Sequence, residues 1–479
     1  MSTFVSVRKN KQAPILEKVL IEDYAAEGKS LARVDGKVIF VEGAVPGDVV
    51  DIQLQKNKAD WAEGFAKTFH SYSPNRVKPF CEHFGVCGGC QWQMLPYAQQ
   101  LQYKHKQVVD NLTRIAKVAL PEIPAILGAT PTEGYRNKVE YTFATEKFIP
   151  FEAFREMKAA GTFPEKSVGA GGFHARGFFE KVVEIDTCHL QEEPTNLMRK
   201  AVAKFAVEND MPFYNIKQHV GWLRNMFVRN TTQGEWMVNL ILGYEDKEKR
   251  EALLNLLLKQ FPQITTLLYT INTKRNDSMQ DLVPQVFFGN GYITEKLEDF
   301  QFKISPKSFF QTNSYQATKL YQVTRDFAEL TGKEVVYDLY CGTGSIGIFC
   351  SKEAKKIIGV EVVAEAIEDA KINASINGLQ DTAFFAGDVI DICDDAFFAA
   401  HGKPDVIITD PPRAGMHEKL VRKLLEMEAP TIVYVSCNPA TQARDLALLD
   451  EKYTVTKIQP VDMFPHTLHI ENVVQLKRK

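Results

Sequence analysis

Residues 334–347 have the sequence EVVYDLYCGTGSIG, and this segment decides the fold of the C-terminal part of the chain. A β-branched strand pattern runs into a glycine-rich turn, which leads into the start of a helix. Gly342, Gly344 and Gly347 form the pattern G-x-G-x-x-G, which taken alone fits a dinucleotide-binding fold equally well. Asp338 stands four residues before the first glycine, a spacing that suits an ammonium group of the methionine type better than a pyrophosphate.

Strand patterns then alternate with helical ones, at residues 356–361, 383–387, 405–410 and 431–435. This alternation predicts an α/β fold with a doubly wound, mostly parallel sheet. Glu361 could accept both ribose hydroxyls of a cofactor, Asp388 would lie beside its adenine, and two prolines direct Asp410 into the crevice. Each acid alone would more commonly cap a helix, but acids at successive strand ends favour a cofactor site.

Residues 433–441, VYVSCNPAT, place Cys437 where a strand becomes a loop, because Pro439 prevents the preceding residue from continuing as helix. A thiolate there would be a nucleophile, although a small buried hydrophobe is the alternative. Residues 457–477 predict two strands joined through residues 463–467. Glu471 enters the second, apolar strand, where burial would raise its pKa and suit it to proton abstraction. A solvated glutamate at a sheet edge is the alternative.

Composition sets the outer bounds. At 479 residues and 54.1 kDa, the chain predicts about two to four domains. The formal charge of −3 excludes a uniformly basic nucleic-acid binder but leaves local basic faces open. The first ten residues carry no hydrophobic signal core and no apolar run is long enough to span a bilayer, so we expect a cytoplasmic protein without membrane contact. Eight cysteines in such a chain favour metal binding or catalysis over disulfides.

Residues 1–72 predict a small β module of about five short strands, separated by tight turns at residues 35–36 and 46–47. This pattern fits an OB-like barrel, a fold that often binds nucleic acid. Its basic side chains could contact phosphates or simply solvate the module. They are Lys9, Lys11, Lys29, Arg33, Lys37, Lys56 and Lys58.

Cys81, Cys87 and Cys90 lie within ten residues, beside two glycines that let the backbone wrap closely round an ion or cluster. Cys188 is the only other cysteine before the C-terminal half. Three local thiols and a distant one suit an iron–sulfur cluster, whose ligands are thiolates. Zinc, with Cys188 or His83 as the fourth ligand, is the alternative.

Residues 73–300 predict a central α+β domain. Helices are expected at 97–116 and 247–260, a strand at 135–143, and a hairpin from 222–228 and 237–242. Residues 169–173, GAGGF, predict a flexible loop before a strand. Arg136 and Lys138, at the start of the first strand, could contact a phosphate or remain solvated.

Together, a methyl donor site, a thiol and a carboxylate indicate methylation at C5 of uracil. That carbon is too weakly nucleophilic to take a methyl group directly, whereas attack of Cys437 on C6 creates an enolate that can. Glu471 would then remove the C5 proton. The target base must be unstacked to reach such a pocket, which predicts a uridine flipped from a loop or single strand. Methylation of an exocyclic amine through Asp410-Pro-Pro412 and a non-catalytic RNA-binding protein are the rivals.

With these motifs, the chain resembles the bacterial RNA 5-methyluridine methyltransferase family, most closely its 23S ribosomal RNA branch. The resemblance implies a TRAM domain at residues 1–72, a central domain at 73–300 and a class I, Rossmann-like methyltransferase domain at 301–479. It implies a 4Fe-4S cluster on Cys81, Cys87, Cys90 and Cys188, the nucleophile Cys437 and the proton acceptor Glu471. Its implied S-adenosylmethionine contacts are Gln311 in FFQTN (309–313), Tyr340, Ser345, Glu361, Asp388 and Asp410.

The sequence departs from that family in two places. Ser345 stands where relatives often have asparagine, and residues 146–170 form an insertion without an assigned function. The bacterial transfer-RNA branch typically lacks both the TRAM module and the cysteine cluster, which favours ribosomal RNA as the partner and a transfer-RNA uridine as the alternative. The expected protein acts as a monomer.

Overall fold

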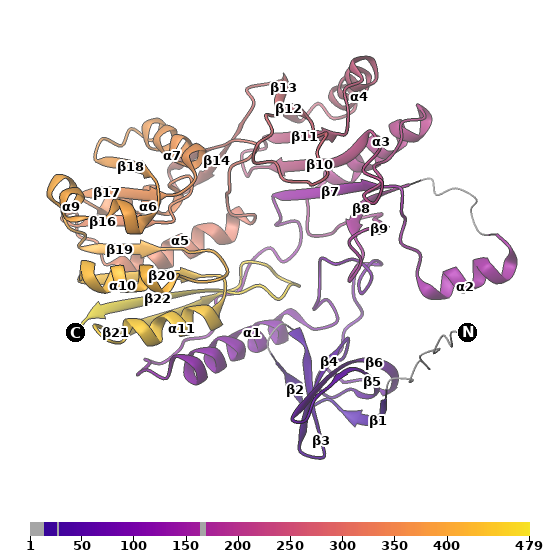
Figure 1. The fold of residues 1–479 in the computed structure, drawn as a ribbon, viewed down its shortest axis with the longest axis horizontal. Coiled ribbons are helices and arrows are strands. Elements are labelled where there is room, and N and C mark those ends of the chain that lie inside the picture. The colour runs from indigo at the N-terminus through magenta and orange to yellow at the C-terminus, as the bar shows by residue number, and fades with distance from the viewer. Residues whose placement is uncertain (1–13, 26–27, 163–168) are drawn as a thin grey trace, which may run out of the picture. The chain divides into compact units, whose positions relative to one another are not determined.

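The computed structural model describes residues 14–25, 28–162 and 169–479. The chain forms two compact units, the first comprising residues 1–85 and 91–103 and the second residues 86–90 and 104–479 (Figure 1). Within the described ranges, no helix combines the length and the apolar character needed to cross a membrane. Lys9 and Lys11, the first ten residues and part of the insertion at 146–170 lie outside the described residues.

The first unit contains one six-stranded sheet with the order β1-β5-β6-β4-β3-β2. Alternate side chains of β5 point inward, so that Val50, Ile52 and Leu54 join a compact hydrophobic core. Asp35 and Gly36 both have positive φ and form the predicted tight turn between β3 and β4. The additional strand relative to the expected five is the two-residue β2. The strands are β1 (Ile15–Leu20), β2 (Asp23–Tyr24), β3 (Ser30–Val34), β4 (Lys37–Glu42), β5 (Val49–Asn57) and β6 (Trp61–Ser71).

In the second unit, a seven-stranded sheet has the order β13-β12-β11-β10-β7-β8-β9. The predicted hairpin is confirmed as the antiparallel pair β10 and β11, and the predicted helix at 247–260 is confirmed as α4, capped by Asp246. The strands are β7 (Lys138–Ala144), β8 (Ala170–His174), β9 (Val182–Glu184), β10 (Leu223–Asn230), β11 (Trp236–Leu242), β12 (Ile264–Ile271) and β13 (Gln285–Phe288). The helices are α2 (Phe151–Ala160), α3 (Thr195–Glu208) and α4 (Lys247–Gln260).

The predicted flexible loop at residues 169–173 is wrong, because residues 170–174 form β8. Glycines are needed in β8 because neighbouring atoms leave no room for a side chain. A Cβ atom at Gly172 would stand 2.0 Å from the carbonyl oxygen of Val183, and one at Gly171 would stand 2.7 Å from the Phe143 ring. The glycines therefore mark a tightly packed strand between β7 and β9, not a mobile loop.

Helix α1 (Tyr97–Asn111) continues into a π-helical turn at Leu112–Ala116, which confirms the helix expected over 97–116. In the insertion, α2 buries none of its side chains and exposes Phe151. Ahead of the C-terminal sheet, β14 (Ile293–Leu297) and β15 (Phe300–Ile304) form a two-stranded ribbon.

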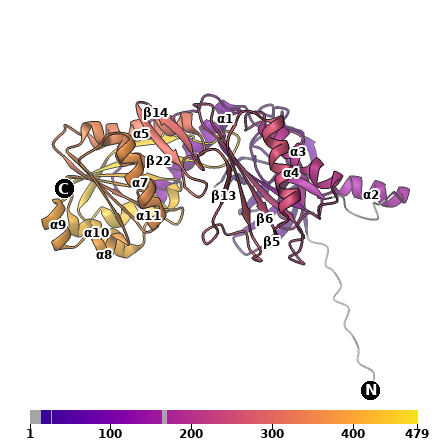
Figure 2. The same ribbon diagram turned by 90° about the horizontal axis from the view of Figure 1, so that it is seen from above.

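The C-terminal sheet has the order β18-β17-β16-β19-β20-β22-β21. Strands β16 to β20 pair in parallel, and β22 enters antiparallel beside β20. Figures 1 and 2 show helices on both faces of this sheet, which confirms the doubly wound α/β prediction. The strands are β16 (Val335–Leu339), β17 (Lys356–Glu361), β18 (Thr382–Ala386), β19 (Val406–Thr409), β20 (Thr431–Ser436), β21 (Tyr453–Val461) and β22 (Glu471–Arg478). The helices are α5 (Ser314–Ala328), α6 (Ser345–Cys350), α7 (Ala364–Ile376), α8 (Val389–Ile392), α9 (Asp395–His401), α10 (Glu418–Met427) and α11 (Pro439–Leu449).

Candidate active site

The predicted site residues of the C-terminal domain gather at one edge of its sheet. Parallel strands end at the same edge, and an antiparallel neighbour begins there, so strand order alone brings these residues together. We call this edge the rim. Its predicted site residues are Asp338, Glu361, Asp388, Asp410, Cys437 and Glu471.

The glycine-rich turn after β16 is built by left-handed backbone. Tyr340, Gly342 and Gly344 have φ values of 60°, 53° and 76°. Gly347 donates its N–H to the Asp338 carboxylate at 2.8 Å, and a Cβ at Gly347 would approach that carboxylate to 2.9 Å. Burial raises the pKa of Asp338 to about 7, against the lowering effect of this hydrogen bond.

Two other rim acids bind backbone N–H groups. Glu361 accepts from Gly342 at 3.3 Å and from Val363 at 3.0 Å. Asp388 is exposed and caps α8 by accepting from Ile390 at 2.9 Å, so in this structure it makes the helix-cap contact that was the alternative to cofactor binding. Around Gly342, no atom lies within 4 Å of where a Cβ would stand, which leaves open space over the turn.

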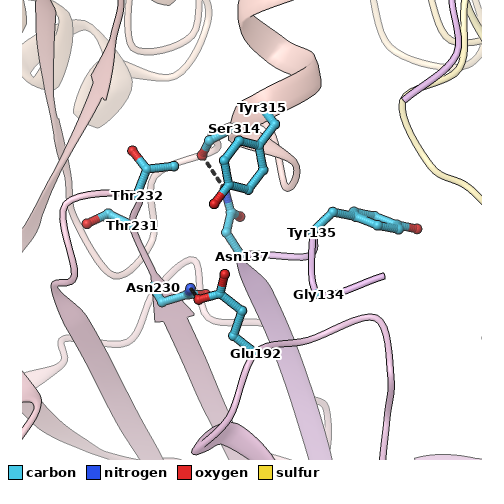
Figure 3. A pocket seen from close by; sticks show the side chains of 9 residues that line it. All are labelled: Gly134, Tyr135, Asn137, Glu192, Asn230, Thr231, Thr232, Ser314 and Tyr315. Atoms are coloured by element: carbon cyan, nitrogen blue, oxygen red, sulfur yellow. Dashed lines mark hydrogen bonds between the residues drawn. The ribbon is translucent and has the colours of Figure 1, made fainter. Parts of the chain in front are cut away.

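Gln311 lies on a segment that the central domain holds by its backbone. Asn137 donates its side-chain amide to the Gln311 carbonyl at 3.1 Å and to the Ser314 hydroxyl at 2.7 Å, and its N–H to the Thr312 carbonyl at 2.9 Å. Figure 3 shows Asn137 and Ser314 meeting in a small polar pocket. Glu192, Asn230, Thr231 and Thr232 also line this pocket.

Ser345 and Tyr340 complete the expected cofactor contacts. The Ser345 hydroxyl lies 2.9 Å from that of Tyr321, a fully buried side chain on α5. Burial raises the pKa of Tyr340, as do the charges of Asp388 and Asp445. These side chains stand at the start of α6 and in the turn before it, and their contact with a cofactor stays a prediction.

Cys437 and Glu471 adjoin the last residue pair between β20 and β22. Ser436 of β20 is opposite Asn472 of β22, and Cys437 and Glu471 are the next residues outward along the two chains. The charge of Glu471 raises the pKa of Cys437, so the two side chains lie close together. Glu471 is 5% exposed, and burial together with the charge of Asp410 raises its pKa well above the ordinary range. Asp410 follows β19, and burial raises its pKa to about 7. Three rim acids, Asp338, Asp410 and Glu471, thus have raised pKa values because of burial.

The Cys437 thiol is partly buried, and burial, Glu471 and Asp410 raise its pKa to about 12. Arg413 opposes them and is the cation whose charge favours the thiolate. Its carbonyl accepts from the Asn438 amide at 3.1 Å and from the Thr441 hydroxyl at 3.3 Å, which ties the loop after β19 to the start of α11. We did not predict a role for Arg413 from the sequence, although its position directly after Asp410-Pro-Pro412 was the available signal.

The basic side chains expected to contact phosphates differ in their burial and in their ion pairs. Lys138 is partly buried, and its pKa falls to about 8 through burial and the nearby charge of Arg229. Arg136 donates to the Lys138 carbonyl at 2.9 Å. In the first unit, Lys29 and Lys56 both pair with Glu63, Arg33 pairs with Glu22, and Lys37 donates to Asn57. RNA contact by these residues stays a prediction.

The four cysteines that the sequence predicts as metal ligands are divided between the two units. Cys81 belongs to the first unit, and Cys87, Cys90 and Cys188 belong to the second. Cys87 and Cys188 pack against the same buried residues, and the charges of Cys90 and Cys188 both raise the pKa of Tyr135. The thiols suit an iron–sulfur cluster chemically, but across the described ranges no three His, Cys, Asp or Glu side chains are arranged to hold a metal ion. The structure therefore does not show the cluster.

The sheet order, the glycine-rich turn and the acids at successive strand ends define an S-adenosylmethionine-dependent methyltransferase. Three family models match this chain: the TRAM domain over residues 17–67, the methyltransferase small domain over 300–431 and tRNA (uracil-5-)-methyltransferase over 398–479.

Whole-chain comparisons agree with these matches. An uncharacterized RNA methyltransferase of Bacteroides thetaiotaomicron is 52% identical and covers 95% of this chain and 99% of its own. One from Porphyromonas gingivalis is 48% identical over 96% and 99%. The structure of the Pyrococcus abyssi tRNA (uracil-54, C5)-methyltransferase with S-adenosyl-L-homocysteine is 27% identical, with a TM-score of 0.72 over 96% of this chain and 100% of that one. This chain belongs to the uracil-5 family of RNA methyltransferases.

Proposed function

We propose that this protein methylates C5 of a specific uridine in RNA, with Cys437 as the covalent nucleophile and Glu471 as the base. The observation that carries this proposal is that Cys437 and Glu471 directly flank the last residue pair of β20 and β22, Ser436 and Asn472, and lie close enough for the charge of Glu471 to raise the pKa of Cys437. A methyltransferase that acts on an exocyclic amine needs neither a thiol nor a buried carboxylate facing it.

The open space over Gly342 fits a bound cofactor beside the rim acids. Glu361 would hold the ribose hydroxyls, and Asp388 would lie beside the adenine. Gln311, Tyr340, Ser345 and Asp410 would complete the site. When bound, S-adenosylmethionine supplies the electrophilic methyl group.

Cys437 starts the reaction by bonding to C6 of the uracil ring, which moves electron density to C5 and O4. Its pKa of about 12 means that the thiol proton must leave before or during this attack. Asp410, with a pKa of about 7, is suited to accept that proton, and the positive charge of Arg413 stabilises the thiolate. The nucleophilic C5 then takes the methyl group.

Glu471 completes turnover. Its carboxylate removes the C5 proton, the electron pair of that C–H bond forms the C5–C6 double bond, and the C6–S bond breaks to release the Cys437 thiolate. A carboxylate whose pKa is raised by burial and by Asp410 is a stronger base than one in water, which suits this step.

RNA containing 5-fluorouridine tests the mechanism, because fluorine cannot leave C5 as a proton. We expect a stable covalent protein–RNA adduct that requires S-adenosylmethionine and fails to form with Cys437→Ala. Multiple turnover without an adduct would refute the covalent mechanism.

We propose 23S ribosomal RNA as the substrate, supported by the TRAM domain and the four cysteines that the resemblance assigns to that branch. Transfer RNA is the second candidate, since the Pyrococcus abyssi structure similar over nearly the whole chain is a tRNA methyltransferase. Mass-spectrometric mapping of 5-methyluridine in both RNA classes, from cells with and without this gene, separates the two. The candidate whose 5-methyluridine persists in the deletion strain is rejected.

We also propose that Cys81, Cys87, Cys90 and Cys188 bind a 4Fe-4S cluster. Thiolates at all four positions are what such clusters require, and the methylation steps above need no electron transfer. Iron and acid-labile sulfide in protein purified without oxygen would support the cluster, and stoichiometric zinc without sulfide would replace it with a zinc site.

A further inference from the structure

The loop that precedes Glu471 is held by side chains that donate hydrogen bonds to its backbone carbonyl groups. This loop, residues 462–470, connects β21 to β22. Three consecutive carbonyl groups each accept a hydrogen bond from a different side chain: Met463 from Asn313 at 2.8 Å, Phe464 from Lys104 at 3.1 Å and Pro465 from Tyr135 at 2.9 Å. We call these three donors, Asn313, Lys104 and Tyr135, the carbonyl clamp.

The clamp residues come from distant parts of the second unit and are all buried. Asn313, Lys104 and Tyr135 are 1%, 0% and 1% exposed. Figure 3 shows the Tyr135 ring pointing away from the other side chains of the polar pocket. A buried lysine or tyrosine is costly unless its polar atoms are satisfied, so the loop and its donors depend on each other.

Lys104 also forms a fully buried ion pair. Its ammonium group lies 2.6 Å from an Asp462 carboxylate oxygen, and neither side chain is exposed. The same carboxylate oxygen accepts the N–H of Phe464 at 3.1 Å, so Lys104 fixes the first turn of the loop through Asp462 as well as through the Phe464 carbonyl.

The hydrogen bonds continue from this turn toward Glu471. The Phe464 carbonyl accepts the Thr467 hydroxyl at 2.8 Å, and that hydroxyl oxygen accepts the N–H of His469 at 3.3 Å. His469 is two residues from Glu471. His466 has a φ of 65°, a left-handed conformation that a non-glycine residue keeps only where its surroundings determine it.

Asn313 joins this loop to the segment of Gln311. Its side-chain oxygen caps α5 by accepting from Gln316 at 3.1 Å, while its amide donates to Met463. One asparagine therefore fixes the proposed cofactor segment and the loop before the proposed base with respect to each other.

We infer that the carbonyl clamp is a set of positioning residues that holds Glu471 in place for removal of the C5 proton. This inference rests on the proposed covalent mechanism. Because the clamp acts on the loop before β22 and not on β20, its loss should slow proton removal and release of Cys437 more than the attack of Cys437 on C6. The methylated covalent adduct should then accumulate.

Tyr135→Phe removes one donor with little change in shape, and Lys104→Met removes the central one. Full-length variants would be mixed with S-adenosylmethionine and with ribosomal and transfer RNA from cells lacking the gene. Adduct formation, release of 5-methyluridine RNA and thermal unfolding would be measured in parallel. We expect release to fall roughly tenfold for Tyr135→Phe and on the order of 100-fold for Lys104→Met, with adduct formation changed less than about threefold.

The double variant Lys104→Met/Asp462→Asn separates positioning from stability. It removes both charges of the buried pair, so thermal stability should recover relative to Lys104→Met. The Phe464 carbonyl still lacks its lysine donor, so adduct accumulation should persist. Arg250→Met is the matched control, because it removes a buried cation of the central domain that pairs with Glu245 at 2.9 Å. It should lower stability without accumulation of adduct.

Two outcomes are distinguishable. If Tyr135→Phe and the double variant slow both steps equally, or leave release unchanged, the clamp is only structural and the inference is overturned. If Glu471→Gln, assayed beside them, forms no methylated adduct while turning over rapidly, the proposed mechanism itself fails whatever the clamp variants do.

Discussion

Cys437 and the four cysteines at 81–188 are held by different kinds of structure. Cys437 directly follows β20, and pairing of β20 with β22 determines which residue lies opposite it. Cys81, Cys90 and Cys188 lie in irregular segments, and Cys87 makes a single isolated bridge with Ala175. A strand therefore places the first thiol, whereas the other four lie in loops and turns with only isolated backbone hydrogen bonds.

This difference bears on how each of the two predicted sites would form. A strand register is set by the sheet and needs no ligand, so Cys437, Asp410 and Glu471 come together at the rim. Thiols in loops are arranged in part by what they bind, because a metal site and its surrounding loops form together. Tyr135 lies near both sites: its hydroxyl donates to Pro465 of the loop before Glu471, and the charges of Cys90 and Cys188 raise its pKa.

The largest effect is expected at Cys437. Serine at this position keeps the shape but cannot supply a nucleophile of comparable strength, so methylation should fall by roughly four orders of magnitude or more. Cys393→Ser, at a buried cysteine outside both sites, is the matched control and should keep near-normal turnover. Initial rates of tritium transfer from labelled S-adenosylmethionine to RNA measure both. Near-normal methylation by Cys437→Ser would favour the exocyclic-amine mechanism.

Glu471→Gln should have the next largest effect, and of a different kind. Glutamine cannot accept the C5 proton, so release should fall roughly 1,000-fold while the first steps continue. A methylated adduct resistant to denaturation should appear on gels and in intact-mass spectra. Glu245→Gln, at a half-exposed side chain on the central domain, should form none. Rapid turnover of Glu471→Gln would assign the base to another residue.

The sequence predicted the rim because its signals are local. Asp338 and Gly347, which donates its N–H to it, lie within ten residues, and each of Glu361, Asp388 and Asp410 follows or ends its own strand. The carbonyl clamp could not be predicted in this way, since Lys104 and Asp462 are 358 residues apart and each looks like an ordinary surface charge in its own segment. The flexible loop predicted around Gly171 and Gly172 was wrong because glycine composition alone does not distinguish a flexible loop from a tightly packed strand.

Cys188→Ser tests the second group of thiols, the four cysteines proposed to bind a cluster. Removal of one thiolate should abolish stoichiometric binding of iron and sulfide, because the remaining three cannot complete the ligand set. Methylation should fall by no more than about tenfold, since no methylation step requires electron transfer. Iron, sulfide and zinc analyses of protein purified without oxygen measure binding, with Cys393→Ser as the control. Unchanged iron and sulfide in Cys188→Ser would remove Cys188 from the proposed site.

Asp338→Asn should act on stability and not on a single reaction step, with an effect that depends on pH. Burial raises the pKa of Asp338 from 3.8 to about 7, so the folded state favours the protonated acid. Its contribution to stability is complete below pH 4 and is lost as the pH rises toward 7, because ionisation of a buried carboxyl becomes costly. A pKa shift of about 3 units corresponds to at most about 4 kcal/mol of folding free energy.

Asparagine has no such ionisation, so the stability of Asp338→Asn relative to the unmodified protein should increase between pH 5 and pH 8. Thermal unfolding of both proteins at these two pH values measures the change, with exposed Asp381→Asn as a control for loss of one negative charge. A relative stability that does not change with pH would mean that the rim does not raise this pKa.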